Sequence, residues 1–555
     1  MGRERFPGDN GGGDDGGGDQ GGDSAHDHDR DRWPLMLTVC CQPDRGQYTL
    51  ARRWKVRCAL NDLFLGIDIG TSSSKGVVAT ADGTVVAAAS RPHTMSLPRP
   101  GWAEVDAEAV WWGDVVGLSR ELTGRVDGAI IGVCVSGVGP CLLPCDAEIQ
   151  PLRPAILYGI DSRAVAEIDE LTARLGADVI IAHGGKALSS QAVGPKLLWL
   201  RRHEPSVWAR TAGWYNSSSF AVARLTGEYV LDHLTASQCD PLYDIVRGRW
   251  NVGWAERVAP GVPLPRLVWP SEVVGTVTAE AAAQTGLPVG TAVCAGTVDA
   301  WAEAFSVGVR RPGEVMLMYG STMFLVQALH TFQTYPMLWT TAGVEPGTHT
   351  LAAGMATSGS LTGWVRQLTG DVSFDDLVVE AAATPPGADG LILLPYFAGE
   401  RTPHFDPRAR GVIAGLTLRH HRGHLFRAAY EGIAYGIRQI LELTDVADGN
   451  LAKRVVAVGG GTQGGLWTQI VSDVTGREQL VPQERVGASY GGALMAAIGT
   501  GTVPFDTDWT RIVASVKPDP RRAEIYDRLY RVFTEMYPAT LEQVHRLADI
   551  QQATS

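Results

Sequence analysis

Residues 64–76 read FLGIDIGTSSSKG, an apolar run that ends on Asp68 and passes through Gly-Thr into three serines. The apolar run predicts a buried β-strand, and the Gly- and Ser-rich segment after it predicts a turn. Two further apolar runs, KGVVAT and TVVAAAS, flank Asp82-Gly83, a pair typical of hairpin turns. The folded part of the chain therefore begins with a predicted antiparallel sheet of three strands.

A similar arrangement returns at residues 313–329, which read GEVMLMYGSTMFLVQAL. Between the two hairpins the chain alternates helical and strand-like segments, which is typical of an α/β fold. The repeated hairpin predicts two related domains, one over residues 62–308 and one over residues 309–505. Residues 506–555 are predicted to be a C-terminal helical segment. Residues 1–60 are rich in Gly and Asp and are predicted to be disordered.

The length, composition and net charge of the chain favour some classes of protein and argue against others. A chain of 555 residues with 45% hydrophobic residues suits two large globular domains. The formal charge of −12 argues against nucleic acid as a partner, and no apolar stretch is long enough to span a bilayer. The eight cysteines show no paired metal-site spacing, so we expect scattered reduced thiols and a cytoplasmic location.

The two hairpin turns are candidate phosphate-binding sites. Tight turns of Gly with Ser or Thr present backbone N–H groups and hydroxyls that suit anionic oxygens. The candidate residues are Thr71, Ser72 and Ser73 in the first turn and Gly320, Ser321 and Thr322 in the second. Facing each other, the two turns could clamp a polyphosphate. Asp68 is placed to hold Mg²⁺ directly or through water, although an Asp that only caps the turn fits the local sequence equally well.

Residues 455–476, VVAVGGGTQGGLWTQIVSDVTG, contain a second glycine-rich turn. Gly459, Gly461 and Gly464 satisfy the GxGxxG pattern of dinucleotide-binding domains. Too little chain follows for the further βα units that such a domain needs. The same glycines can instead let the backbone approach an adenine nucleoside closely, or can serve helix–strand packing alone.

Asp299 lies in CAGTVDAWAEAFSVGV (294–309), between an apolar strand and an Ala-rich helix. An Asp at this place is a good helix N-cap, and position alone favours that role. The alternative is a general base at the junction of the two domains, where a cleft is expected. The chain has no GxxxxGK[ST] segment, so phosphate chemistry of the P-loop type is not expected.

Taken together, these segments resemble the FGGY family of carbohydrate kinases. The two hairpins are similar to its phosphate hairpins, and residues 394–437, which contain GERTPHFDP, are similar to its long signature. The glycine-rich segment and GASYGGALMAAIGTG are similar to its nucleoside-binding region. The resemblance covers residues 62 to about 540, and LLWLRRHEP (197–205) leans toward the xylulokinase branch.

The resemblance implies two duplicated actin-like (ribonuclease H-like) ATPase domains with ATP and sugar in an interdomain cleft. It implies transfer of the γ-phosphoryl group of Mg²⁺-ATP to a hydroxyl of a ketose, a pentulose such as xylulose, or a related polyol. Asp299 matches the catalytic base of the family, so we now favour the role of general base over that of helix N-cap. Asp68 matches the acid near Mg²⁺. The residues that match the nucleoside site are Gly459, Gly460, Gly461 and Gln463.

The chain departs from its xylulokinase relatives on the sugar side. Where those enzymes carry Gln-Met-His, this chain has Val138-Gly139-Pro140, which offers no side-chain hydrogen bonds. Their Trp-Asn-Asp-Gly-Arg corresponds to residues 158–163, and Asp161 and Arg163 are the candidate substrate-binding residues there. Met323 replaces a glycine of the second phosphate loop. These departures concern the choice of sugar, while the kinase chemistry is retained.

Other functions stay open at this stage. The altered sugar-side segments also suit a kinase-dead regulator that binds sugar or nucleotide on the same fold. A chaperone-like or filament-forming ATPase shares the fold but has no reason to keep GERTPHFDP, and a dinucleotide oxidoreductase is the weakest alternative. As partners we expect a small-molecule sugar or polyol, with a homodimer left open, and neither nucleic acid nor a membrane.

Overall fold

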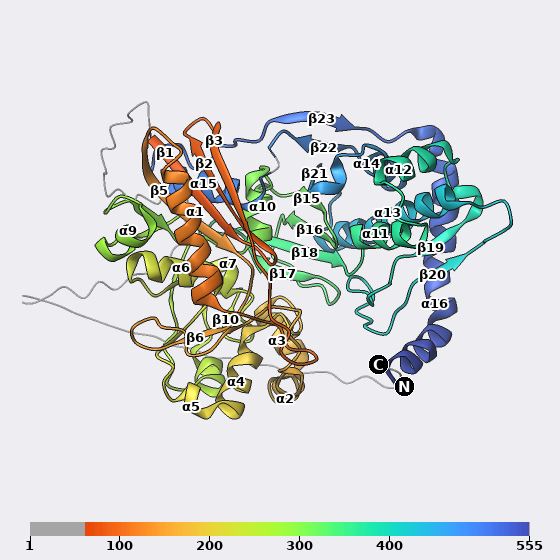
Figure 1. Ribbon diagram of the computed structural model, residues 1–555. Helices are drawn as coiled ribbons and strands as arrows, with labels where there is room; N and C mark the ends of the chain where they lie inside the picture. Colours follow the sequence, from red (N-terminus) through yellow and green to blue (C-terminus); the bar gives the residue numbers. More distant parts are fainter. Residues whose placement is uncertain (1–61, 485, 554–555) are drawn as a thin grey trace, which may run out of the picture. The chain divides into compact units, whose positions relative to one another are not determined.

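A computed structural model describes residues 62–484 and 486–553 (Figure 1). The predicted disorder of residues 1–60 falls outside the described residues. The predicted opening sheet is confirmed, because β1 (Asp62–Ile69), β2 (Ser73–Thr80) and β3 (Val85–Pro92) pair antiparallel in sequence order. They form one side of a six-stranded sheet of order β13-β14-β5-β1-β2-β3, completed by β5 (Ala129–Gly137), β13 (Val273–Thr276) and β14 (Ala292–Cys294).

The predicted second hairpin also forms, as β15 (Glu314–Tyr319) and β16 (Met323–Ala328). It lies in a seven-stranded sheet of order β17-β18-β16-β15-β21-β22-β23. The other strands of this sheet are β17 (Trp339–Ala342), β18 (His349–Met355), β21 (Arg454–Val458), β22 (Gln479–Pro482) and β23 (Ile512–Val516).

The two sheets share one strand pattern, which confirms the duplication. In each sheet the first hairpin strand pairs antiparallel with the second and parallel with a strand from later in the chain, β5 for β1 and β21 for β15. A further parallel strand follows, β14 or β22, and an antiparallel strand, β13 or β23, closes that edge. Two βββαβ-type units with the same strand directions are therefore present in one chain.

Two helices connect the sheets. α10 (Asp299–Ser306) follows β14 of the first sheet but packs with apolar residues of the second, including Met316 and Val326. α15 (Ala488–Gly499) follows β22 of the second sheet but packs against Phe64 and Val77 of the first. Each domain's sheet is thus covered in part by a helix that the sequence attaches to the other domain.

The crossing of α10 and α15 depends on glycine. A Cβ at Gly491 of α15 would lie 2.0 Å from the carbonyl oxygen of Ala302 in α10, and a Cβ at Gly66 of β1 would lie 1.8 Å from the carbonyl oxygen of Ser489. No side chain fits at such distances, so the two helices approach each other and the first sheet at backbone contact.

The remaining helices and short strands surround the two sheets. In the first domain the helices are α1 (Gly113–Thr123, after a π-helical turn at Ala107–Trp112), α2 (Val165–Leu175), α3 (Ala177–Gly184), α4 (Val193–His203), α5 (Pro205–Trp208), α6 (Ser217–Thr226), α7 (His233–Ala236), α8 (Val252–Val258) and α9 (Ala279–Thr285). In the second domain they are α11 (Gly359–Leu368), α12 (Phe374–Ala383), α13 (Arg422–Asp448), α14 (Leu466–Thr475) and α16 (Ala523–Ala553). The short strands are β4 (Glu104–Val105), β6 (Leu143–Cys145), β7 (Ala155–Ile156), β8 (Gly213–Tyr215), β9 (Val230–Asp232), β10 (Tyr243–Asp244), β11 (Arg249–Trp250), β12 (Arg266–Val268), β19 (Ile392–Leu394) and β20 (Val412–Ala414).

Residues 506–555 contain more than the predicted helical segment. Strand β23 is the edge strand of the second sheet, and α16 packs against the core of the second domain beside α13 (Figure 1). Tyr526 of α16 is buried, and its hydroxyl lies within hydrogen-bond distance of Arg427 and Glu431 on α13. This segment therefore completes the second domain instead of forming a separate unit.

The structure also bears on the expectations about the cysteines and about membrane-spanning segments. Cys134, Cys141, Cys145, Cys239 and Cys294 are buried and free, as expected for unpaired thiols. Between residues 62 and 553, Arg485 aside, the chain has no helix with the length and apolar character needed to cross a bilayer.

Candidate active site

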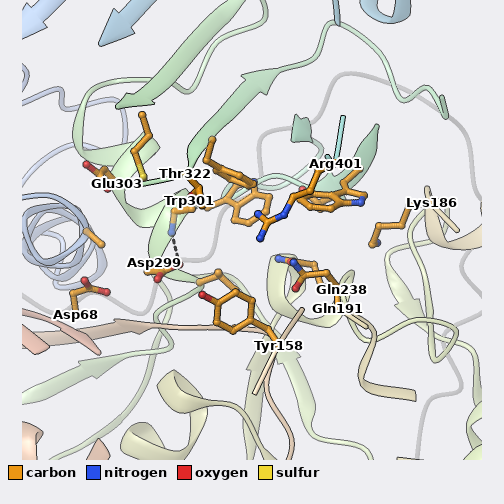
Figure 2. Close-up of a pocket in the computed structure, with 18 residues that line it drawn as sticks. Asp68, Tyr158, Lys186, Gln191, Gln238, Asp299, Trp301, Glu303, Thr322 and Arg401 are labelled. Atoms are coloured by element: carbon orange, nitrogen blue, oxygen red, sulfur yellow. Dashed lines mark hydrogen bonds between the residues drawn. The ribbon is translucent and has the colours of Figure 1, made fainter. Parts of the chain in front are cut away.

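A cavity of about 270 Å³ lies between residues of the two domains (Figure 2). Its wall includes three predicted site residues, Asp68, Asp299 and Thr322. The other lining residues are Gly139, Tyr158, Lys186, Gln191, Gln238, Val298, Ala300, Trp301, Glu303, Met318, Phe324, Trp339, Thr341, Arg401 and Ala488. The cavity therefore joins the end of the first hairpin, the start of α10 and the second hairpin.

Asp299 is the first residue of α10, one position after the N-cap residue Val298. Its Oδ1 accepts a hydrogen bond of 2.7 Å from the backbone N–H of Ala300. Burial raises the pKa of the Asp299 carboxyl, while this hydrogen bond acts in the opposite direction. The N-cap role weighed from the sequence is therefore wrong for Asp299, since Val298 holds that position and α10 has no side-chain capping bond, while the Asp299 carboxylate lines the cavity.

Asp68 lies near the end of β1, opposite Lys75 in β2 and beside Ser136 in β5. Its Oδ1 accepts a hydrogen bond of 3.1 Å from the Ser136 hydroxyl. Burial raises the pKa of the Asp68 carboxyl, and the negative charge of Asp299 raises it further. The carboxylate is therefore held at the cavity wall in surroundings that favour a nearby positive charge.

Glu303 is a third acid in this part of the cavity, one turn after Asp299 on α10. Burial and the charge of Asp299 raise the pKa of Glu303 to about 7, and Lys75 opposes the shift. Glu303 was not among the residues predicted from the sequence. Its spacing of four from Asp299 places both carboxylates on one helix face, and that periodicity could have identified it.

Asp68 and Glu303 are candidate carboxylates for a divalent cation that takes its other ligands from phosphate and water. Burial, and after it the negative charge of Asp299, raises the pKa values of both acids, and a nearby cation would offset that cost. Among the described residues no three His, Cys, Asp or Glu side chains form a metal cage by themselves. Mg²⁺ suits such a place, because it is held by one or two carboxylates together with phosphate oxygens and water.

The two hairpin turns have the same length, residues 70–72 and residues 320–322. Gly70 N–H donates to the Ser73 carbonyl at 3.2 Å, and Gly320 N–H donates to the Thr322 carbonyl at 3.2 Å. Ser321, the central residue of the second turn, is exposed, whereas in the first turn Ser72 is exposed and the central residue Thr71 is half-buried. The two turns therefore have the same number of residues but close differently, since the bond from the first glycine reaches three residues ahead in the first turn and two residues ahead in the second.

The turns contribute to the cavity in different ways. Thr322 lines it directly, whereas Thr71 reaches it through a contact of 3.0 Å between its Oγ1 and the hydroxyl of the cavity residue Tyr158. Four other predicted phosphate-binding residues, Ser72, Ser73, Gly320 and Ser321, are not among the lining residues.

The glycine-rich segment lies between β21 and α14, as predicted, and Gly459 lines a second, small cavity. Glu303 lines this cavity as well, so the two cavities meet at that side chain. Gly459 has φ +91°, and a Cβ there would meet the backbone of Tyr319. A Cβ at Gly461 would instead meet Trp467 at 2.6 Å, so this glycine serves packing.

The other members of the segment face open space. A Cβ at Gly460 would meet no heavy atom within 4 Å, and Gln463 is exposed. The backbone around Gly460 is therefore open to an approaching ligand, which is the arrangement expected of a nucleoside site.

The predicted substrate residues Asp161 and Arg163 are not brought to the cavity. Their side chains are fully buried and form an ion pair of 2.7 Å, and Arg163 also contacts Glu104 at 2.8 Å. The Arg163 guanidinium lies 3.8 Å from the ring centre of Trp102. Because these contacts use the charged groups internally, the structure does not support direct substrate binding by this pair. Tyr158, from the same segment, lines the cavity instead.

Most of the cavity-lining residues that lie away from the three acids were not predicted from the sequence. These residues come from separate loops and strands of both domains and are Tyr158, Lys186, Gln191, Gln238, Trp301, Phe324, Trp339 and Arg401. Arg401 belongs to GERTPHFDP, which was singled out as a motif but not assigned a role. The two glutamines stand in segments with no local pattern that marks a binding site.

Comparison with known proteins identifies the family. Residues 63–306 match the model of the N-terminal domain of the FGGY family of carbohydrate kinases, and residues 315–500 match the model of its C-terminal domain. The chain belongs to the FGGY family of carbohydrate kinases. Its duplicated domains therefore have the actin-like ATPase fold, and its enzyme class is that of a phosphotransferase acting on a carbohydrate, as the sequence predicted.

Relatives of this FGGY kinase carry the names of sugar kinases. It is 30% identical to the xylulose kinase of Lactococcus lactis subsp. lactis over 87% of this chain and 98% of that protein. It is 25% identical to the gluconokinase of Bacillus subtilis over 89% of this chain and 99% of that protein. The crystal structure of xylulose kinase from Rhodospirillum rubrum has 35% identity and a TM-score of 0.80, covering 87% of this chain and all of that one.

His93 holds the first hairpin turn of the kinase in place. Its backbone N–H donates to the Ser72 carbonyl at 3.0 Å, and its Nε2 donates to the Gly70 carbonyl at 3.0 Å. Its Nδ1 lies 2.8 Å from the carboxylate of Asp114, which also accepts from the Ser74 hydroxyl at 2.7 Å. Both ring nitrogens face oxygen acceptors, so this side chain joins the turn to α1.

We expect His93→Leu to loosen the turn and leave the Asp114 carboxylate short of a donor. Loss of such a buried partner costs about 1–3 kcal/mol, so thermal stability should fall. The KM for ATP should rise about ten-fold, a difference of about 1.4 kcal/mol, with a smaller change in kcat. Steady-state kinetics check this split. His203→Leu, on α4 and outside both cavities, is the control, and an unchanged KM for ATP in His93→Leu would contradict the prediction.

The acid pKa values predict a pH dependence of stability. Folding raises the pKa of Asp68 and Glu303, so the native state binds these protons more tightly than the unfolded chain. Their favourable contribution is complete below about pH 4 and is lost as pH rises through the raised values, to about 7 for Glu303. Asp299→Asn removes a charge that repels both acids. Without ligands, its melting temperature should exceed that of the wild type at pH 8 and approach it at pH 5, and a pH-independent difference would contradict this account.

Proposed function

We propose that this FGGY enzyme transfers the γ-phosphoryl group of Mg²⁺-ATP to a hydroxyl of a ketose, a pentulose such as xylulose, or a related polyol, with Asp299 as general base. The observation that carries the proposal is the position of the Asp299 carboxylate. It lines the cavity beside two further acids that suit a cation and near Thr322 of the second phosphate turn. An acceptor hydroxyl and a polyphosphate can therefore both be served from one cavity.

Bound Mg²⁺-ATP supplies the phosphoryl group and the positive charge that balances the acids. Around it, Asp68 and Glu303 are the carboxylates that would hold the cation. The turns at residues 70–72 and 320–322 would offer N–H groups and hydroxyls to phosphate oxygens, and the open backbone near Gly460 would receive the nucleoside.

Asp299 is suited to remove a proton. Its Oδ1 is held by the Ala300 N–H at 2.7 Å, which leaves Oδ2 to accept the proton of a substrate hydroxyl. Burial, which raises the Asp299 pKa, makes the carboxylate a stronger base than an exposed Asp. Trp301, Phe324 and Trp339 line the cavity and would cover the apolar face of a bound sugar and exclude water.

The test measures ATP consumption with a panel of pentuloses, hexuloses, alditols and aldonates. A coupled assay of ADP release, with and without Mg²⁺, provides the readout. We expect Mg²⁺-dependent turnover with at least one class of compound and low ATP hydrolysis without an acceptor. ATP hydrolysis that no acceptor accelerates, or nucleotide binding without turnover on any member of the panel, would contradict the proposal.

A further inference from the structure

The cavity has two ends of different chemistry. Asp68, Asp299 and Glu303 are acceptors at one end, whereas the side chains at the other end, Lys186, Gln191, Gln238 and Arg401, carry N–H groups (Figure 2). In Figure 2 the guanidinium of Arg401 and the amides of Gln191 and Gln238 point into the same space, on the side of Asp299 away from Asp68. This second end has no role in the proposed phosphoryl transfer.

Lys186 is already satisfied by the protein. Its Nζ contacts the Asp240 carboxylate at 2.7 Å and donates to the carbonyls of Ser237 at 2.7 Å and Gly184 at 3.1 Å. Two of its donors are used by these carbonyl oxygens, and its charge is balanced by the Asp240 carboxylate. Lys186 therefore adds no unbalanced charge to the cavity.

Arg401 is different, because its guanidinium forms no ion pair or hydrogen bond among the described residues. Its backbone N–H donates to Glu400 Oε1 at 2.6 Å, and this carboxyl also accepts from the Ala356 N–H at 2.9 Å. Burial raises the pKa of Glu400 to about 8, while the two backbone hydrogen bonds and the charge of Arg401 oppose the shift. A guanidinium whose five donors bond to no described residue therefore lines the cavity.

Two amide groups beside Arg401 also offer donors. Gln238 is only 7% exposed, and its Nε2 is buried without an acceptor. Gln191 Oε1 accepts from the Gly159 N–H at 3.2 Å, which orients the amide and leaves its NH₂ group as the part available to a ligand. A buried donor without an acceptor is costly, so a ligand that supplies acceptor oxygens would relieve that cost.

Donors without matching acceptors favour an anionic group over a hydroxyl. A carboxylate only accepts hydrogen bonds and binds a guanidinium through two parallel ones, whereas a hydroxyl also needs an acceptor. We propose that the substrate is an open-chain polyhydroxy acid whose carboxylate binds Arg401, Gln238 and Gln191 while one of its hydroxyls reaches Asp299. This inference rests on the proposed function and selects the acid-bearing members among polyol-like substrates.

The first test compares matched acceptors in the panel, D-gluconate against D-glucitol and D-xylonate against xylitol and D-xylulose. We expect kcat/KM for the acid to exceed that for its neutral partner at least ten-fold. Equal or better use of the neutral compounds would overturn the inference and leave the proposed function standing. Turnover with no member would instead contradict the proposed function.

The second test locates the anion. The oxygens of the phosphate donor are the other anionic chemistry within reach, so the variant must separate the two sources. In Arg401→Leu we expect the acid-to-neutral ratio of kcat/KM to fall at least ten-fold, and D-gluconate binding without nucleotide, measured by calorimetry, to weaken at least ten-fold. An equal fall for acid and neutral acceptors, with unchanged D-gluconate binding, would assign Arg401 to the phosphate donor and overturn the inference.

Two further variants complete the design. Arg419→Leu removes an exposed arginine outside the cavity and should leave both the ratio and the binding as in the wild type. Gln238→Leu removes the unpartnered NH₂ while keeping the volume similar, and it should weaken D-gluconate binding without loss of thermal stability. Stronger or unchanged D-gluconate binding in Gln238→Leu would contradict the assignment of this amide to the carboxylate.

Discussion

Asp299→Asn is expected to reduce kcat about 10²–10⁴-fold, which is the usual contribution of a positioned general base. Asn keeps the size of the side chain, and its amide oxygen can still accept from the Ala300 N–H. It cannot take a proton from a hydroxyl. The variant should therefore bind ATP with a Kd close to that of the wild type, which fluorescence or calorimetric titration can measure.

The control for this variant is Asp106→Asn. The Asp106 side chain caps the π-helical turn at Ala107–Trp112 by accepting from the Ala109 N–H at 3.0 Å, and it lies outside the cavity. It should retain wild-type kcat, because Asn also caps helices well. Turnover of Asp299→Asn within a few-fold of the wild type would remove Asp299 from the role of base, and lost ATP binding would point to a structural defect instead.

The parts of the fold that could be predicted from sequence are local. In each hairpin a strand, a Gly-Ser turn and a second strand follow one another in the chain. The hairpins at residues 62–80 and 314–328 could therefore be predicted from two apolar runs and the turn residues between them. The duplication followed because the same local pattern occurs twice. For Asp299 the local pattern of a strand end, a Gly-Thr turn and a helix start indicated only a helix cap, and the role of base came from the resemblance to the FGGY family.

The donor-rich end of the cavity could not be predicted in this way. Gln191, Gln238 and Arg401 are separated by long stretches of chain and meet only when both domains fold. Asp161 and Arg163 show the opposite case, because charged residues in a motif-like segment satisfy each other in the interior. A sequence shows which side chains could bind a ligand but not which of them are already used by the protein.

The crossing of α10 and α15 was also invisible in the sequence, and it leads to the second large predicted effect. Gly491→Ala places a methyl group 2.0 Å from the Ala302 carbonyl oxygen in α10, so the helices must separate. Overpacking of this kind typically costs about 1–3 kcal/mol, and here the obstacle is backbone and cannot rotate away. We expect a clear fall in melting temperature.

The same change should reduce activity, because Asp299 is the first residue of α10 and moves with it. A displacement of about 1 Å at a catalytic group can cost about 10²-fold in rate, so kcat should fall by up to that factor. The matched control is Gly363→Ala in α11, where a Cβ meets no heavy atom within 4 Å. There Ala favours the helix by about 1 kcal/mol, and kcat should stay as in the wild type. If Gly491→Ala matched Gly363→Ala in both measurements, the crossing would not position the base, and the position of Asp299 would have to depend on the β14–α10 turn alone.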